Sequence, residues 1–140
     1  MPVRLTGDQL GSLAVARATI TANATTTATT SGTATALLTL PNAFYEGGTY
    51  RVELWCINMT KGTTNLDIEL QVDGVFSISL SGALAANTGI PTIFEGFVTL
   101  SPGNHVVRAV GFVDAGTGTI VAGTGATATN PPAYLAIYPA

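Results

Sequence analysis

The stretch that decides the fold is residues 65–81, NLDIELQVDGVFSISLS. Before its Asp-Gly pair, three apolar side chains alternate with two acids and a glutamine; after the pair, three more alternate with serines. Alternation with a period of two is typical of a half-buried β-strand, and two such runs around a short turn indicate a hairpin. The sequence therefore predicts an antiparallel hairpin with one apolar face.

The register of this hairpin follows from which side chains can share a face. A two-residue Asp-Gly loop would place Phe76 opposite Gln71, on the charged face. A three-residue loop over 72–74 pairs Leu70 with Phe76 and gathers all six apolar side chains on one side. We therefore expect the longer loop, with Gly74 in the left-handed conformation beside a β-bulge.

Strand patterns continue on both sides of the hairpin. Residues 49–58, TYRVELWCIN, put apolar side chains on one face and two charged side chains on the other. Residues 92–100 and 105–113 flank a Pro-Gly turn and predict a second hairpin. Further short strands are expected over 33–40, 119–122 and 133–138. Eight or nine short strands with turns between them predict an all-β fold, a two-sheet jelly roll or β-sandwich of antiparallel strands.

The first 36 residues differ in composition from the rest. Residues 14–36 are almost entirely Ala, Thr, Ser, Asn and Gly. This composition leaves three alternatives: an extended N-terminal arm, a weak first strand over roughly 14–25, or a flexible tail. We expect a domain boundary here, with the arm or first strand over 1–36 and the jelly-roll domain over 37–140.

Charge is scarce along the chain. Charged residues make up 9% of the 140 residues and the net charge is −3, whereas an average soluble domain has roughly 25% charged residues. A surface with so little charge is weakly protected against association. We therefore expect much of this surface to be covered by partner proteins. We expect no nucleic-acid binding, because there is no basic stripe, and no membrane span, because there is no long apolar run.

Candidate catalytic and metal-binding residues are few. The single His105 and the single Cys56 cannot supply a zinc site, and the sequence predicts a structural histidine and a buried thiol. Asp67, Glu69 and Glu53 are expected on a solvated strand face. The acids near other turns occur singly, whereas a calcium site needs several carboxylates in one loop. We therefore expect no enzyme activity, no metal and no cofactor.

The remaining candidates are contact surfaces, because some large apolar side chains fall on strand faces opposite the expected core. Aromatic side chains are favoured at interfaces. The candidate interface residues are Val15, Ile20, Trp55, Ile57, Ile93, Phe97, Tyr134 and Tyr138.

Several short motifs resemble those of a known group of proteins. They are GGTYRV at 47–52, VDG at 72–74, LSPGNHVV at 100–107 and PAYLAI at 132–137. Over roughly residues 40–138 the chain resembles small jelly-roll proteins of tailed-bacteriophage particles, including capsid decoration proteins, head fibres and tail-tip modules. Tumour-necrosis-factor-like and C1q-like jelly rolls share these elements. The resemblance implies a homotrimer seated on a capsid lattice.

The leading functional hypothesis is a non-enzymatic virion protein that decorates the outer capsid surface and stabilises it. Its expected partners are further copies of itself and the major capsid protein, and its expected place of synthesis is the host cytoplasm. The alternative is a receptor- or carbohydrate-binding module at a tail tip or fibre, with Trp55, Tyr134 or Tyr138 as the stacking surface for a sugar.

Overall fold

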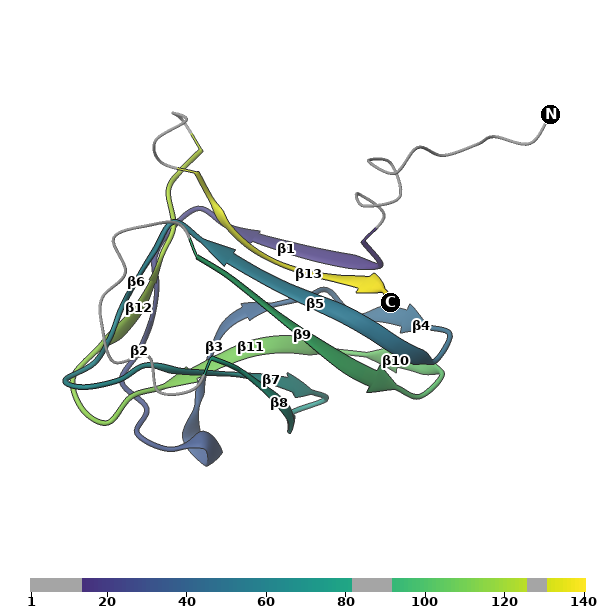
Figure 1. Ribbon diagram of the computed structural model, residues 1–140, viewed down its shortest axis with the longest axis horizontal. Helices are drawn as coiled ribbons and strands as arrows, with labels where there is room; N and C mark the ends of the chain where they lie inside the picture. Colours follow the sequence, from purple (N-terminus) through teal and green to yellow (C-terminus); the bar gives the residue numbers. More distant parts are fainter. Residues whose placement is uncertain (1–13, 82–91, 126–130) are drawn as a thin grey trace.

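Two four-stranded antiparallel sheets form the body of the protein in a computed structural model, which describes residues 14–81, 92–125 and 131–140. The first, called the β5 sheet, has the strand order β1 (Ala16–Ile20), β13 (Ala133–Pro139), β5 (Gly48–Cys56) and β9 (Thr92–Leu100). The second, called the β7 sheet, has the order β3 (Thr35–Thr39), β11 (Val107–Phe112), β7 (Asp67–Val72) and β8 (Val75–Ser81). Figure 1 shows the β5 sheet above the β7 sheet.

The strand pairs identify the topology. Among these eight strands, the first pairs with the last, β1 with β13, and the following pairs are β3 with β11, β5 with β9 and β7 with β8. Successive pairs of this long folded hairpin alternate between the two sheets, which is the arrangement of a jelly roll. The predicted all-β, two-sheet jelly-roll fold is therefore confirmed.

Shorter strands close the two ends of the sandwich (Figure 1). At one end, β12 (Gly118–Val121) lies between β2 (Ala24–Thr26) and β6 (Asn58–Thr60); at the other, β4 (Ala43–Tyr45) pairs with β10 (Gly103–His105). A 3-10 turn, η1 (Ser31–Thr33), precedes β3. The Ala/Thr-rich stretch from residue 16 thus contributes β1, β2, η1 and the start of β3. Residues 1–13, 82–91 and 126–130 lie outside the described residues, and with them the first part of the expected N-terminal arm.

The core lies between the two sheets and follows the predicted alternation of β5. Val52, Leu54 and Cys56 of β5 are fully buried, as are Ile68 and Leu70 of β7. Burying one such aliphatic side chain contributes about 1.5–3 kcal/mol to folding. This apolar layer fixes the orientation of the β5 sheet and points its other face outward.

The predicted register of the β7–β8 hairpin is wrong. The loop has two residues, Asp73 and Gly74, with φ of 52° and 82°, as a type I′ turn requires. Phe76 lies opposite Gln71 and is 53% exposed. The prediction assumed a regular ladder with every apolar residue on one face. Instead, a register shift between Leu70 and Gln71 makes Ile78 the partner of Leu70 and brings the later part of β8 back to the core, and a second shift follows between Ile68 and Glu69.

The second predicted hairpin is also wrong. β9 pairs with β5, whereas β11 pairs with β3 and β7, so the turn after Leu100 carries the chain from one sheet to the other. Val98 and Val107 are both buried, and they reach the core from opposite sheets. Alternation showed that both strands have an apolar face, but it could not show which sheet each strand joins.

Candidate functional site

The outward face of the β5 sheet gathers five of the predicted interface residues. The strand register places Tyr134 of β13, Trp55 of β5 and Ile93 of β9 in one row. A second row contains Tyr138, Arg51 and Phe97. We call this surface the outer face; its rows join side chains that are far apart in the sequence.

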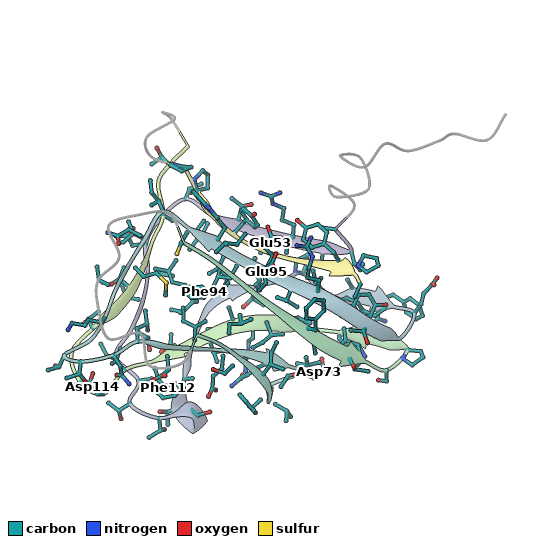
Figure 2. All side chains as sticks on the ribbon, in the orientation of Figure 1. Glu53, Asp73, Phe94, Glu95, Phe112 and Asp114 are labelled. Carbon is teal, nitrogen blue, oxygen red and sulfur yellow. The ribbon has the colours of Figure 1, made fainter. Side chains whose placement is uncertain are left out.

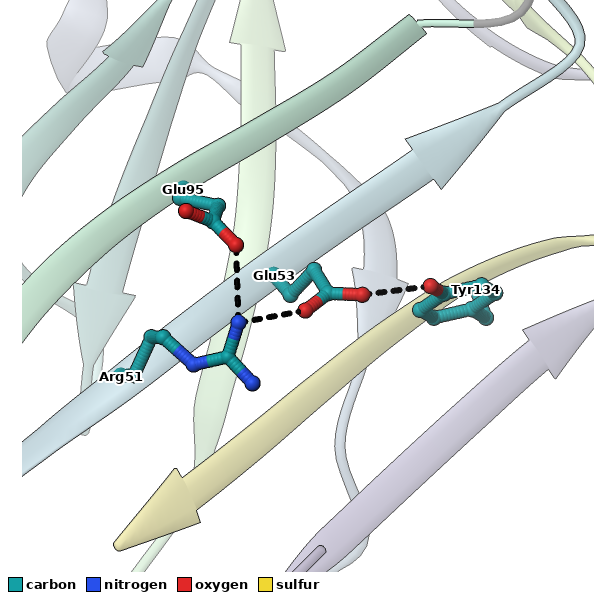
Figure 3. Close-up of polar contacts among 4 residues, drawn as sticks. All are labelled: Arg51, Glu53, Glu95 and Tyr134. Atoms are coloured by element: carbon teal, nitrogen blue, oxygen red, sulfur yellow. Dashed lines mark hydrogen bonds and ion pairs between the residues drawn. The ribbon is translucent and has the colours of Figure 1, made fainter. Parts of the chain in front are cut away.

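A polar network occupies the middle of the outer face (Figure 3). Arg51 donates to Glu53 at 3.0 Å and to Glu95 at 2.8 Å, and the Tyr134 hydroxyl donates to Glu53 at 2.5 Å. The Glu53 side chain is only 11% exposed, so these charged and hydroxyl donors compensate its burial. Burial and the hydrogen bond to Glu53 together raise the pKa of Tyr134 to about 12.

Two arginines cover the tyrosine rings beside this network. The Arg17 guanidinium lies 4.2 Å from the centre of the Tyr134 ring, and that of Arg51 lies 4.7 Å from the centre of the Tyr138 ring. Trp55 stacks against Tyr134 with ring centres 6.1 Å apart and an interplanar angle of 13°. Cation–π and stacking contacts of this kind orient the side chains of the outer face.

The outer face is hollowed near the start of β13. A cavity of about 270 Å³ lies there. Its lining residues are Arg17, Thr19, Trp55, Pro131, Pro132 and Tyr134. The cavity combines aromatic carbon with a cation and a hydroxyl, which is the chemistry of a site for a small polar ligand.

The other three predicted interface residues do not join the outer face. Ile20 packs against the core, and Ile57 lies half-buried in the bend between β5 and β6. Val15 is 37% exposed and lines a separate hollow of about 540 Å³ with Phe44 and Pro139.

The prediction missed an exposed apolar stretch on β8. Val75 is 68% exposed and Phe76 is 53% exposed. On β9, Ile93 and Phe97 are 51% and 60% exposed. The type I′ turn could have revealed this stretch, because it puts Phe76 on the face of Gln71.

These four side chains lie on the edge strands of the two sheets, and we call them together the apolar edge. β8 and β9 contact each other where Gly96 approaches Ile78 and Leu80. Ile93 and Phe97 belong to the outer face of the β5 sheet, whereas Phe76 shares the outward face of the β7 sheet with Gln71.

His105 connects the β7–β8 turn to β10, as a structural histidine would. Its Nδ1 lies 2.6 Å from Oδ2 of Asp73, and its Nε2 lies 2.9 Å from the carbonyl oxygen of Ser101. A carbonyl oxygen only accepts, so Nε2 is the donor and cannot take a proton from the Ser101 hydroxyl 3.4 Å away. The hydrogen bond between His105 and Asp73 is the main cause of both pKa shifts. It raises the pKa of His105 and lowers the pKa of Asp73. This geometry does not match a Ser–His–Asp nucleophile, in which the histidine accepts that proton.

Asp114 fastens two loops together. Its carboxylate accepts hydrogen bonds from the backbone N–H and hydroxyl of Thr64 and from the N–H of Asn65. These donors hold the pKa of Asp114 far below its usual range. In Figure 2, Asp114 and Asp73 lie at opposite ends of the β7 sheet. Within the described residues no group of three or more His, Cys, Asp or Glu side chains could hold a metal ion.

Cys56 is a free thiol in the core, and burial raises its pKa to about 11. A protonated, buried thiol is a poor nucleophile. In the part of the chain that the structure describes, no helix is long and apolar enough to cross a membrane.

Comparison with known proteins gives similarity of fold only. The sequence matches no protein-family model and no curated protein. A family 35 carbohydrate-binding module from Clostridium thermocellum is 15% identical, with a TM-score of 0.46 over 89% of this chain and 98% of the module. The sugar-binding C-terminal domain of EclA is 13% identical, with a TM-score of 0.48 over 84% of this chain and 78% of that chain.

A viral protein is similar to the same degree. VP2 of infectious bursal disease virus, in a subviral particle, is 12% identical, with a TM-score of 0.44 over 86% of this chain and 36% of VP2. The similar structures are thus jelly-roll proteins of more than one kind. At these identities the likeness concerns the fold alone.

Proposed function

We propose that this protein is a non-enzymatic structural component of a virus particle that binds the outer capsid surface and stabilises the shell. The observation that carries the proposal is the apolar edge: four large apolar side chains, each more than half exposed, on adjacent edge strands. Large apolar side chains left this exposed on neighbouring edge strands are candidate sites of protein association. The low charge of the chain, 9% of residues, fits a surface that is covered by partners.

The mechanism is burial of the apolar edge against the capsid. Each copy that binds only to the assembled shell shifts the equilibrium toward that shell by mass action. The polar network around Arg51 and Glu53 is already paired within the chain, so it can border such a contact without leaving a charge unpartnered. Tailed phages are the proposed source and a homotrimer the proposed unit, both on the basis of the sequence motifs.

Capsids stripped of surface proteins test the proposal. Purified protein is mixed with such capsids, and binding is measured by co-sedimentation while shell stability is measured by thermal release of DNA. We expect saturable binding and a higher release temperature. Absence of both effects would refute a decoration role.

Two phenylalanines give a matched pair of variants. Phe97→Gln removes an aromatic side chain from the apolar edge, whereas Phe44→Gln removes an equally exposed one, 62% against 60%, from β4 at the end of the sandwich. Loss of an interface aromatic weakens binding by about tenfold or more. We expect that loss for Phe97→Gln alone; equal binding by both variants would exclude the apolar edge as the contact.

The proposed trimer has its own test. Native mass spectrometry of the isolated protein should give a mass three times that of the 14.2-kDa chain. A monomer at micromolar concentration would refute the trimer and leave the capsid test independent of it.

A further inference from the structure

The cavity on the outer face has walls from separate parts of the chain. Arg17 and Thr19 belong to β1, Trp55 to β5 and Tyr134 to β13, while Pro131 and Pro132 directly precede β13. Its volume of about 270 Å³ lies just below the roughly 300–1,000 Å³ of typical ligand pockets. The cavity is thus large enough to take one sugar-sized ring.

Its apolar lining favours a ligand with a carbon-rich face. Trp55 and Tyr134 are held nearly parallel by their mutual stacking, and both proline rings are only partly buried. The Tyr134 hydroxyl is committed to Glu53. Because Arg17 already covers the Tyr134 ring, the carbon surface against which the C–H face of a sugar ring can pack is that of Trp55.

Its polar lining favours a negative charge on that ligand. The Arg17 guanidinium is positioned by the Tyr134 ring, and among the described residues no carboxylate forms an ion pair with it. Glu53, the nearby acid, is already engaged by Arg51 and Tyr134. A guanidinium held in place and without a carboxylate partner is suited to a bidentate bond with a carboxylate from outside.

We infer that this cavity binds an acidic sugar, with the sugar carboxylate on Arg17, the ring against Trp55 and a ring hydroxyl near the hydroxyl of Thr19. This glycan site is additional to the proposed capsid contact, which uses the apolar edge. On a particle surface it would attach the particle to acidic glycans of a cell envelope or coat.

The single tryptophan makes the site directly observable. Trp55 is the one tryptophan of the 140-residue chain, so fluorescence excited selectively at tryptophan, outside the tyrosine absorption band, reports this cavity. The isolated full-length protein is titrated with sialyllactose and with its neutral counterpart lactose, and separately with digalacturonate and with its neutral counterpart, digalactose of the same linkage. We expect saturable quenching by at least one acidic sugar and binding at least about tenfold weaker by its neutral counterpart, because a charge-assisted hydrogen bond is lost. The two acidic probes separate sialic acid from uronic acid as the natural ligand.

Three variants decide whether Arg17 is responsible. Arg17→Gln should bind the acidic sugar about tenfold more weakly, and Arg17→Lys should recover part of that loss. Lys61→Gln, which removes a positive charge elsewhere, should bind like the unmodified protein. Circular dichroism checks that each variant is folded.

Three results would overturn the inference: no saturable quenching by either acidic sugar, equal affinity for the acidic and neutral sugars, or an equal effect of Arg17→Gln and Lys61→Gln. Because no capsid is present in this assay, failure here leaves the proposed decoration role untouched.

Discussion

Replacing Gly62 by alanine should destabilise the protein strongly, although the change adds one methyl group. Gly62 lies in the loop between β6 and β7. A Cβ built on it would lie 2.3 Å from the carbonyl oxygen of Ala115 and 2.7 Å from Cβ of Val113. Neither atom is the end of a flexible side chain, so the loop that holds Gly62 and the loop that holds Ala115 must move apart.

The size of the effect follows from what those loops hold together. Separation strains the bond from the Thr63 N–H to the Ala115 carbonyl, 2.7 Å long, and the bonds from Thr64 to Asp114. Overpacking costs about 1–3 kcal/mol, and each lost hydrogen bond about 1 kcal/mol. We expect a loss of about 3 kcal/mol, which lowers the melting temperature by about 10 °C in a chain of this length.

Thermal unfolding followed by circular dichroism measures this loss. The matched control is Gly32→Ala in η1, where a Cβ would meet no atom within 4 Å, and we expect it to melt within about 2 °C of the unmodified protein. The rate at which a thiol reagent modifies Cys56 gives a second measurement. This thiol is fully buried, so it should react faster in the Gly62→Ala protein, whose fold opens more often. A Gly62→Ala protein that melts like the control would refute the steric argument.

Three further predictions concern single side chains. Tyr134→Phe removes a donor from Glu53 and should lower the free energy of unfolding by about 1–3 kcal/mol in urea titrations. His105 has its pKa raised above the ordinary 6.5, mainly by Asp73, so its charged form should stabilise the fold below about pH 6.5 and lose that effect as pH rises through the raised pKa. The difference in melting temperature between the unmodified protein and His105→Gln should therefore be smaller at pH 8.5 than at pH 5.5. Leu54→Ala should cost about 2–5 kcal/mol, measured in the same urea titrations, because it opens a cavity in the core.

Several of these side chains could be placed from local pattern alone. The alternation in residues 49–58 correctly assigned Tyr50, Val52, Leu54 and Cys56 to the core. Because successive side chains of a strand point to opposite faces, the same pattern also put Arg51 and Trp55 on the opposite side. Local alternation therefore predicts which face of a strand is buried.

The register of β8 could not be read in this way. Ile78 and Leu80 reach the core because the ladder bulges, and they approach Gly96 of β9, where a Cβ would lie 2.6 Å from Cδ1 of Ile78. Room for the two side chains thus comes from a glycine in the other sheet. No periodicity within residues 65–81 contains that information.

The sequence by itself determined that this is an antiparallel all-β protein with little charge, because strand alternation and composition are local properties. The tertiary structure alone decided that Arg17, Trp55 and Tyr134 share one cavity and that Phe76 is exposed beside the strand carrying Phe97. Those neighbours are set by which strands pair and in which register. Pairing between distant strands depends on how the two sheets pack together, which a linear pattern does not record.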